Sequence, residues 1–148
     1  LLGKNCRFNR EHSHLLDLEE LDVDFIPVCP EEAGKLGTPR PAAEIQGSSE
    51  NILKGHVRIL TNDGNDVTKQ FVQGAKKSLE VGLTSGVEVA ILKSHSPSCG
   101  VGEVYDGSFT HSLTDGNGIF SHLCQESGIT CISSDDSNQI KKTLKKLK

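Results

Sequence analysis

Residues 87–107 read VEVAILKSHSPSCGVGEVYDG, and the apolar run that opens this stretch decides the fold class. A continuous apolar run such as 87–92 is typical of a strand that is covered on both faces, as strands of parallel sheets are. A second short apolar run, ITCIS, spans residues 129–133. Segments typical of helices lie around these strands, at residues 14–21, 69–86, 118–128 and 138–148. This alternation predicts an α/β fold: a single three-layer, Rossmann-like domain with a mostly parallel sheet.

Two further segments are predicted to add strands. VDFIPVC (residues 23–29) is a short β-rich run that ends at Pro30. In residues 50–68, the tight turn NDGN is predicted to join a pair of strands, VRILT and DVT. Thr68 is then expected to cap the following helix, which Gly86 is expected to end.

Length and charge limit the classes of protein that the chain can belong to. The 148 residues predict one domain over residues 1–148. Because the chain begins LLGKNC without a methionine, we expect its first strand to be missing. The net charge of −4 argues against nucleic acid or a membrane as the main partner, despite the basic segment KKTLKKLK. No apolar run approaches the roughly 20 residues of a membrane span. A cytoplasmic protein is expected, with monomer and dimer both open.

The cysteines fall into two groups. The five residues are widely spaced, without the Cys-x-x-Cys pairs of zinc ribbons and thioredoxin-like motifs: Cys6, Cys29, Cys99, Cys124 and Cys131. Cys29 and Cys99 follow predicted strands, at the sheet edge where α/β proteins bind ligands, and Cys6 could join them there. Cys124 and Cys131 lie inside a predicted helix and strand, and we expect both to behave as small buried hydrophobic side chains.

The motifs LLGKNCRF, PVCPEE, GTPRPAAEI, ILKSHSPSCG and EVYDGSF occur in this order along the chain. In type, order and approximate spacing they resemble the DUF523 family, which includes thiouracil desulfurases. The resemblance runs from residue 1 to about residue 133. It implies an iron–sulfur enzyme that acts on a small thiolated molecule, such as thiouracil or a related base.

The same resemblance implies a [4Fe-4S] cluster that is held by three cysteines, with one iron left without a protein ligand. Matched by motif, two of the ligands are Cys29 and Cys99. The third is either a cysteine directly before Leu1, where the family has one, or Cys6. Thiolates are the ligands that suit such clusters, and an open iron is a soft Lewis acid that can bind a thiocarbonyl sulfur. Water would then replace the sulfur without net electron transfer.

Three side chains near these cysteines are predicted to be catalytic. Glu31 lies two residues after Cys29, where partial burial beside a cluster suits a general acid or base; it could equally be a favourable acid in the first turn of a helix. Ser96 and Ser98 flank Pro97, and their hydroxyls are predicted to hydrogen-bond substrate or cluster sulfide, with turn or cap residues as the alternative. Gly100 is expected to allow a close backbone approach.

A second group of residues is predicted to bind substrate. It consists of Arg40, Glu44, Lys93, Tyr105 and Asp106. Arg40 lies between two prolines and either pairs with Glu44 or binds the substrate directly. Asp106 is equally consistent with an Asx turn. His95 is expected to face solvent.

Three functions remain compatible with these features. The leading hypothesis is the iron–sulfur-dependent desulfurase. The second is a module that binds a cluster or sulfide without turnover, and the third is a cluster-free enzyme with Cys99 as its nucleophile.

Overall fold

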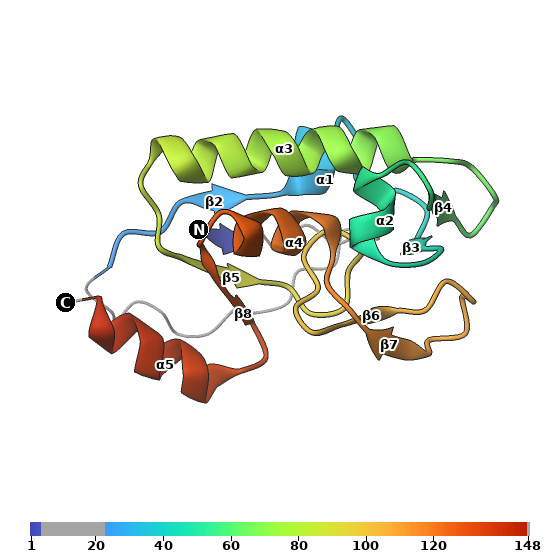
Figure 1. The fold of residues 1–148 in the computed structure, drawn as a ribbon. Helices are drawn as coiled ribbons and strands as arrows, with labels where there is room; N and C mark the ends of the chain where they lie inside the picture. Colours follow the sequence, from blue (N-terminus) through green and yellow to red (C-terminus); the bar gives the residue numbers. More distant parts are fainter. Residues whose placement is uncertain (4–22, 148) are drawn as a thin grey trace.

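The central sheet has four strands in the order β2–β1–β5–β8. The structure is a computed structural model that describes residues 1–3 and 23–147 (Figure 1). The sheet strands are β1 (Leu2–Gly3), β2 (Pro27–Val28), β5 (Val89–Leu92) and β8 (Thr130–Ser133). Every pairing is parallel, and all four residues of β5 are buried, as the apolar run predicts. Strand β1 lies between β2 and β5 in the sheet; the expectation that a first strand is missing stays a prediction.

Two antiparallel strand pairs lie outside this sheet. Strand β3 (Ala43–Ile45) pairs with β4 (Ile59–Thr61), and β6 (Glu103–Tyr105) pairs with β7 (Leu113–Asp115). The chain therefore has a mixed α/β fold that is built from small sheets, some of them parallel. The three-layer, Rossmann-like arrangement stays a prediction.

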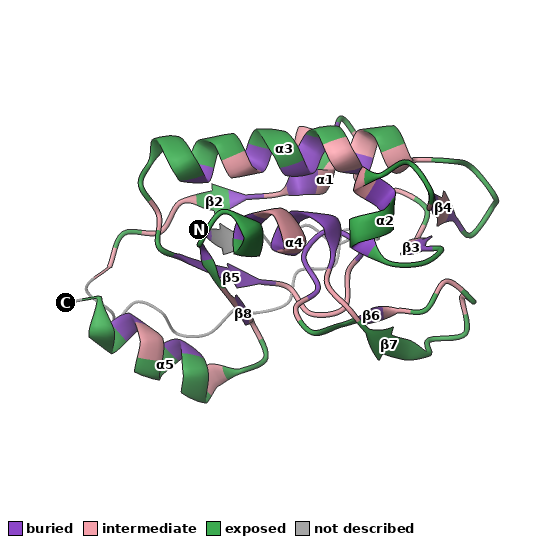
Figure 2. Ribbon diagram, viewed as in Figure 1, coloured by how far each residue is buried: buried purple, intermediate pink, exposed green. Residues whose placement is uncertain are grey.

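Helices pack on both faces of β5, because its residues alternate in direction. Val89 and Ile91 pack with Ile140 and Leu144 of the last helix, in a small cluster. The other two residues of the strand join a larger cluster with side chains of α3 and α4 (Figure 2). The helices of the described residues are α1 (Pro30–Ala33), α2 (Ser49–Leu53), α3 (Thr68–Thr84), α4 (Ile119–Glu126) and α5 (Ser137–Lys146).

Two local predictions are wrong. The predicted pairing of VRILT with DVT is wrong: β4 pairs with β3 instead, and only an isolated bridge joins Leu60 to Asp66. The segment Ser49–Leu53, just before VRILT, is a helix that Ser48 caps by accepting a hydrogen bond from Asn51 N (3.4 Å). Thr68 is the first residue of α3, and not its cap. Its amide and its hydroxyl donate to Asp66 Oδ1 (3.0 and 2.6 Å), so the aspartate satisfies this helix end.

The predicted strands at residues 87–92 and 129–133 and the predicted helices at residues 118–128 and 138–148 agree with β5, β8, α4 and α5 to within a few residues. Gly86 follows α3 with a φ of 66°, a left-handed conformation that suits the end of a helix. The predicted helix at residues 14–21 lies outside the described residues. Within the described part of the chain, no helix has the length and apolar character needed to cross a membrane.

Candidate active site

The loop after β5 is a tight turn that buries Cys99. The amide of Cys99 donates to Ser96 Oγ (2.8 Å), and the amide of Gly100 donates to Ser96 O (2.9 Å). A Cβ on Gly100 would lie 2.7 Å from Val104 Cγ1 and 2.9 Å from Ser96 O, so the predicted close approach is confirmed. The Cys99 residue is only 6% exposed. The turn therefore places a thiol below the surface at the carboxyl end of the sheet.

Helix α1 brings Cys29 and Glu31 to the same edge. Cys29 follows β2 as the N-cap residue of α1, and it is disulfide-bonded in this structure. The helix packs backbone to backbone on α3: a Cβ on Gly34 would lie 2.0 Å from Gln70 O, and one on Gly74 would lie 1.8 Å from Pro30 O. Because no side chain separates the two helices here, α3 fixes the position of α1.

The Glu31 carboxylate connects the two cysteine-bearing segments. Its Oε2 accepts a hydrogen bond from Ser98 Oγ (3.0 Å), and Ser98 Oγ lies 3.3 Å from Ser96 Oγ. Ser98 is 1% exposed, so its hydroxyl is shielded from bulk water. The three side chains predicted to be catalytic thus form one hydrogen-bonded row.

The Ser98 hydroxyl also lies 3.7 Å from Cys99 Sγ. A hydroxyl has one proton to donate, and the shorter contact to a carboxylate takes it. Burial raises the pKa of the Cys99 thiol to about 12, and the nearby Glu31 charge adds to the increase. In the absence of a metal, Cys99 is therefore a neutral thiol at physiological pH.

Arg40 orients Glu31 rather than Glu44. Its Nε donates to Glu31 Oε1 (3.1 Å), and Nη1 donates to Gly37 O (3.1 Å) and Thr38 Oγ1 (3.0 Å). The Arg40 side chain is 7% exposed and that of Glu31 is 18% exposed, so the ion pair is mostly buried. Of the alternatives that the sequence left open, the structure supports an ion pair, but with a different carboxylate.

Two residues of the predicted substrate-binding group hold a loop in place. Glu44 Oε1 accepts from the amides of Gly107 (3.0 Å) and Phe109 (3.2 Å). Asp106 Oδ1 accepts from the amide (2.9 Å) and hydroxyl (2.5 Å) of Ser108, so it forms the Asx turn that the sequence offered as its alternative. These bonds lower the pKa of Asp106.

Lys93 and Tyr105 are half-buried beside the loop that carries Cys99. Lys93 directly follows β5, and Tyr105 is the last residue of β6. A role in substrate binding stays a prediction for every member of this group.

The described residues supply two of the predicted cluster ligands, Cys29 and Cys99, whereas Cys6 lies outside them. Within residues 1–3 and 23–147, no group of three His, Cys, Asp or Glu side chains could hold a metal ion. The other two cysteines lie beside each other: Cys124 is fully buried and Cys131 is half-buried. Their mutual hydrogen bond raises the pKa of Cys124 and lowers that of Cys131. A three-thiolate site therefore needs a ligand beyond the described residues.

Sequence reasoning missed several residues that shape this site. It did not single out Gly34, Gly74 or Gly118, although a Cβ on Gly118 would lie 2.4 Å from the backbone of Ser98. It placed His95 in solvent, and it did not consider His111. A lone glycine or histidine in a sequence carries no signal of such a contact, which depends on the tertiary packing.

A buried thiol beside a serine-bound carboxylate, at the carboxyl edge of a parallel sheet, is the arrangement of a candidate cysteine-containing site in an α/β protein. Comparison with known proteins gives the family. The sequence matches the family model for 2-thiouracil desulfurase over residues 1–136, so the chain belongs to that family, DUF523.

Two relatives cover almost the whole chain. One is an uncharacterized protein, YbbK, from Bacillus subtilis (strain 168), which is 36% identical over 141 residues and matches 93% of each chain. The other is the solved structure of a [4Fe-4S]-dependent thiouracil desulfidase, TudS (DUF523Vcz). It superimposes with a TM-score of 0.84 at 31% identity, over 98% of this chain and 97% of that chain. This similarity confirms the fold and supports an iron–sulfur cofactor.

Proposed function

We propose that this protein is a [4Fe-4S]-dependent desulfurase that replaces the thiocarbonyl sulfur of a small thiolated base, such as thiouracil, with oxygen. The observation that carries the proposal is the hydrogen bond between Glu31 and Ser98 (3.0 Å), because it joins the segments of Cys29 and Cys99 and places a carboxylate between them. The family and the dependence of TudS on a [4Fe-4S] cluster support the same chemistry.

The donor set fits the cluster chemically. Cys29 and Cys99 provide soft thiolate ligands, and Cys6 or a cysteine directly before Leu1 is the proposed third ligand. Metal binding removes thiol protons, so the raised pKa of Cys99 does not oppose this role. When bound, a cluster with three protein ligands supplies an open iron that polarises a thiocarbonyl group.

Glu31, Ser98 and Ser96 would move protons in this reaction. A thiocarbonyl and water give a carbonyl and hydrogen sulfide, with no oxidant or reductant. Arg40 holds Glu31 Oε1, which leaves Oε2 directed at Ser98 Oγ. The carboxylate accepts a proton from the attacking water, and the two hydroxyls, 3.3 Å apart, extend the path along which that proton returns to the leaving sulfur.

The cluster-free alternative is disfavoured by the environment of Cys99. A cysteine nucleophile needs a lowered pKa, whereas burial raises the pKa of this thiol to about 12. A non-catalytic module that binds a cluster or sulfide differs from the enzyme in one respect only: it would hold the cluster without releasing hydrosulfide from a thiolated base.

The proposal is tested by anaerobic reduction and reconstitution of the chain, followed by iron and acid-labile sulfide analysis and by hydrosulfide release from 2-thiouracil. We expect the Cys29→Ala and Cys99→Ala variants to lose the cluster. We expect Glu31→Gln to keep the cluster but to lose about 100-fold or more in kcat, the range of general acid–base catalysis. Near-zero iron in a reconstituted chain that retains Cys6 and also carries a cysteine directly before Leu1 would refute the proposal.

Two matched controls separate chemistry from folding. Glu32 is the exposed neighbour of Glu31, and Glu32→Gln is expected to keep full activity. Cys131 is a half-buried thiol outside the site, and Cys131→Ala is expected to keep both cluster and turnover. Equal losses in control and site variants would contradict the assigned roles.

A further inference from the structure

Two free thiols lie beside each other between α4 and β8. Cys124 belongs to the second turn of α4, and Cys131 is the second residue of β8. Both cysteines are free, and Cys124 is fully buried whereas Cys131 is half-buried. The proposed desulfurase reaction uses neither of them. A pair of thiols can form a disulfide only where the two side chains meet, so the surroundings of this pair decide what it can do.

A tight connection after α4 brings β8 back against the backbone of Cys124. Gly128 adopts a left-handed conformation with a φ of 81°, as is common directly after a helix. The amide of Ile129 then donates to Cys124 O (2.9 Å). Ile129 and Cys131 are two residues apart in extended chain, so their side chains point the same way, and both join the hydrophobic cluster that contains Cys124. The Cys131 side chain is therefore directed at α4.

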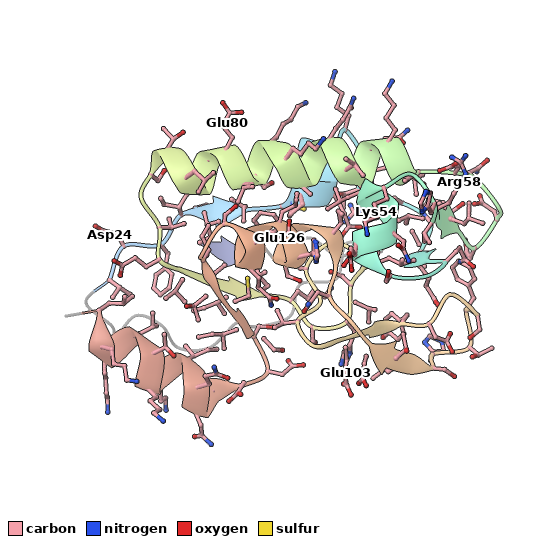
Figure 3. The ribbon with its side chains drawn as sticks, in the orientation of Figure 1. Asp24, Lys54, Arg58, Glu80, Glu103 and Glu126 are labelled. Carbon is pink, nitrogen blue, oxygen red and sulfur yellow. The ribbon has the colours of Figure 1, made fainter. Side chains whose placement is uncertain are left out.

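The sulfur of Cys131 lies on the face of α4 that presents Cys124. Cys131 Sγ donates to Ser121 O (3.7 Å), and Ser121 is three residues before Cys124, so the two residues share one face of the helix. The two thiols also hydrogen-bond each other. Glu126, which Figure 3 labels on α4, is two residues after Cys124 and belongs to the opposite, exposed face. The two thiol groups thus meet in the reduced protein.

The two thiols differ in reactivity. Cys131 is the more exposed of the pair, and its hydrogen bond with Cys124 lowers its pKa. The same bond, followed by burial, raises the pKa of Cys124. A thiolate is the form that attacks a disulfide, so Cys131 is the first nucleophile. Once the Cys131 sulfur is bonded to another sulfur, the main cause of the raised pKa of Cys124 is gone, and Cys124 can react in turn.

The first turn of α4 holds the loop that carries Ser98 and Cys99. Four amides at this end of the helix donate to carbonyl groups of the loop: Gly118 N to Gly100 O (2.8 Å), Ile119 N to Pro97 O (2.8 Å), and Phe120 N and Ser121 N to Ser98 O (2.8 and 3.3 Å). The fully buried Ser121 adds a bond from Oγ to Gly100 O (2.5 Å). Ser121 therefore contacts the loop through its hydroxyl and Cys131 through its carbonyl. A displacement of this turn displaces the loop with it.

We propose that Cys124 and Cys131 are a modification site, at which a small-molecule disulfide such as glutathione disulfide joins them in an intramolecular disulfide that lowers turnover. The Cys131 thiolate attacks one sulfur of glutathione disulfide and expels a glutathione thiolate. Cys124 then attacks the Cys131 sulfur of the mixed disulfide and expels the second glutathione thiolate. The two cysteine protons pass to the two glutathione thiolates, so the protein loses two electrons and glutathione disulfide gains them.

The loss of turnover rests on the proposed function, whereas the formation of the disulfide does not. A disulfide holds its sulfur atoms about 2.0 Å apart, more than about 1 Å closer than two hydrogen-bonded thiols. Cys131 Sγ also has to give up its bond to Ser121 O. The first turn of α4 shifts as the helix adjusts, and Ser98 moves with it. Because a misplacement of about 1 Å can cost about 100-fold in rate, we expect kcat to fall by about 10-fold or more.

Mass spectrometry tests the disulfide directly. The full chain, with and without reconstituted cluster, is reduced, treated anaerobically with glutathione disulfide, alkylated and digested with trypsin. The tryptic peptide 94–141 contains all three free cysteines, and cleavage after glutamate divides it at Glu103 and Glu126. We expect fragments 104–126 and 127–141 to stay joined, and dithiothreitol to separate them. Fragments that are alkylated and separate, or a link that involves Cys99, would overturn the proposal.

Hydrosulfide release from 2-thiouracil by the same oxidised, cluster-loaded chain tests the effect on turnover. We expect the lower kcat to recover with dithiothreitol, while the visible absorption of the cluster stays constant throughout. The Cys131→Ala variant is the matched control, and its kcat should not respond to glutathione disulfide. An equal loss in this variant, or an unchanged kcat in oxidised wild type, would overturn the effect on turnover. A chain that releases no hydrosulfide before oxidation would refute the enzyme, and the joined fragments would still decide the disulfide.

Discussion

The substitution Gly74→Ala tests whether the packing of α1 on α3 sets the position of the Glu31 carboxylate, which is proposed to be catalytic. A Cβ at residue 74 would lie 1.8 Å from Pro30 O and 2.7 Å from Gly34 N. Both are backbone atoms, which cannot rotate away as a side-chain end can. Helix α1 would have to withdraw by about 1.5 Å to restore van der Waals separation.

Two energies of opposite sign determine the stability of this variant. Alanine is favoured over glycine in a helix interior by about 1 kcal/mol. Overpacking costs about 1–3 kcal/mol or more, and the clash here is with backbone, so we expect a net loss of about 1–2 kcal/mol. The same withdrawal takes Glu31 Oε2 out of hydrogen-bonding range of Ser98 Oγ, now 3.0 Å away. A misplacement of this size is expected to lower kcat/KM by about 100-fold.

Gly82 provides the matched control, because it lies in the same helix. A Cβ there would contact only side chains, Leu1 Cδ1 at 2.8 Å and Val87 Cγ2 at 3.1 Å, which can shift. We expect Gly82→Ala to keep its activity and to change the stability by less than about 1 kcal/mol. Urea unfolding followed by circular dichroism and hydrosulfide release measure the two quantities. If Gly74→Ala were as stable and as active as Gly82→Ala, the backbone contact would not position the site.

Three further predictions follow from single contacts. Asp66→Ala removes the acceptor for the Thr68 amide and should lower the free energy of unfolding by about 0.5–2 kcal/mol, as measured by urea unfolding. The bonds from Thr68 lower the pKa of Asp66. The stabilisation they give is therefore present at neutral pH and is lost as the pH falls below the usual range of an aspartate. In the reduced, cluster-free chain, iodoacetamide at pH 8 should modify Cys131 well before Cys99, because the pKa of Cys99 is raised to about 12 and that of Cys131 is lowered. Mass spectrometry follows the two modifications, and equal rates would contradict the burial of Cys99. Arg40→Lys should reduce kcat by about 10-fold, because one ammonium cannot bond Glu31 while it also bonds Gly37 O and Thr38 Oγ1, as the guanidinium does; wild-type hydrosulfide release would contradict this role.

The parts of the fold that the sequence predicts are those set by local pattern. The apolar run of β5 and the helical periodicity of α3 are visible in one dimension, because burial on two faces or on one stripe determines which residue types occur. The pairing of VRILT with DVT was not found, because β4 pairs with β3, a partner from another part of the chain that the local turn pattern does not reveal.

The parts that the sequence does not predict are set by tertiary contact. Arg40 reaches Glu31, nine residues earlier, rather than Glu44, because α1 folds back beside it. The left-handed backbone conformation of His95 accompanies its bridge to Val104 of β6, and the residue type alone does not predict this conformation. The cysteines and the side chains proposed to be catalytic were predicted from family motifs. Their hydrogen bonds could not be predicted, because these depend on the tertiary structure.

The cluster of buried residues under helix α5 is smaller than the cluster on the other side of the sheet. Helix α5 docks mainly through Ile140 and Leu144 onto a small cluster, and it begins at Ser137, just after the family match ends at residue 136. An element held by so few buried side chains opens at a lower free energy than the core, and its amides exchange with deuterium first. The Glu31–Ser98 contact lies outside that cluster. Fraying of this helix would therefore expose apolar residues of the sheet before it disturbs the Glu31–Ser98 contact, so resistance to aggregation can be changed without altering the candidate site.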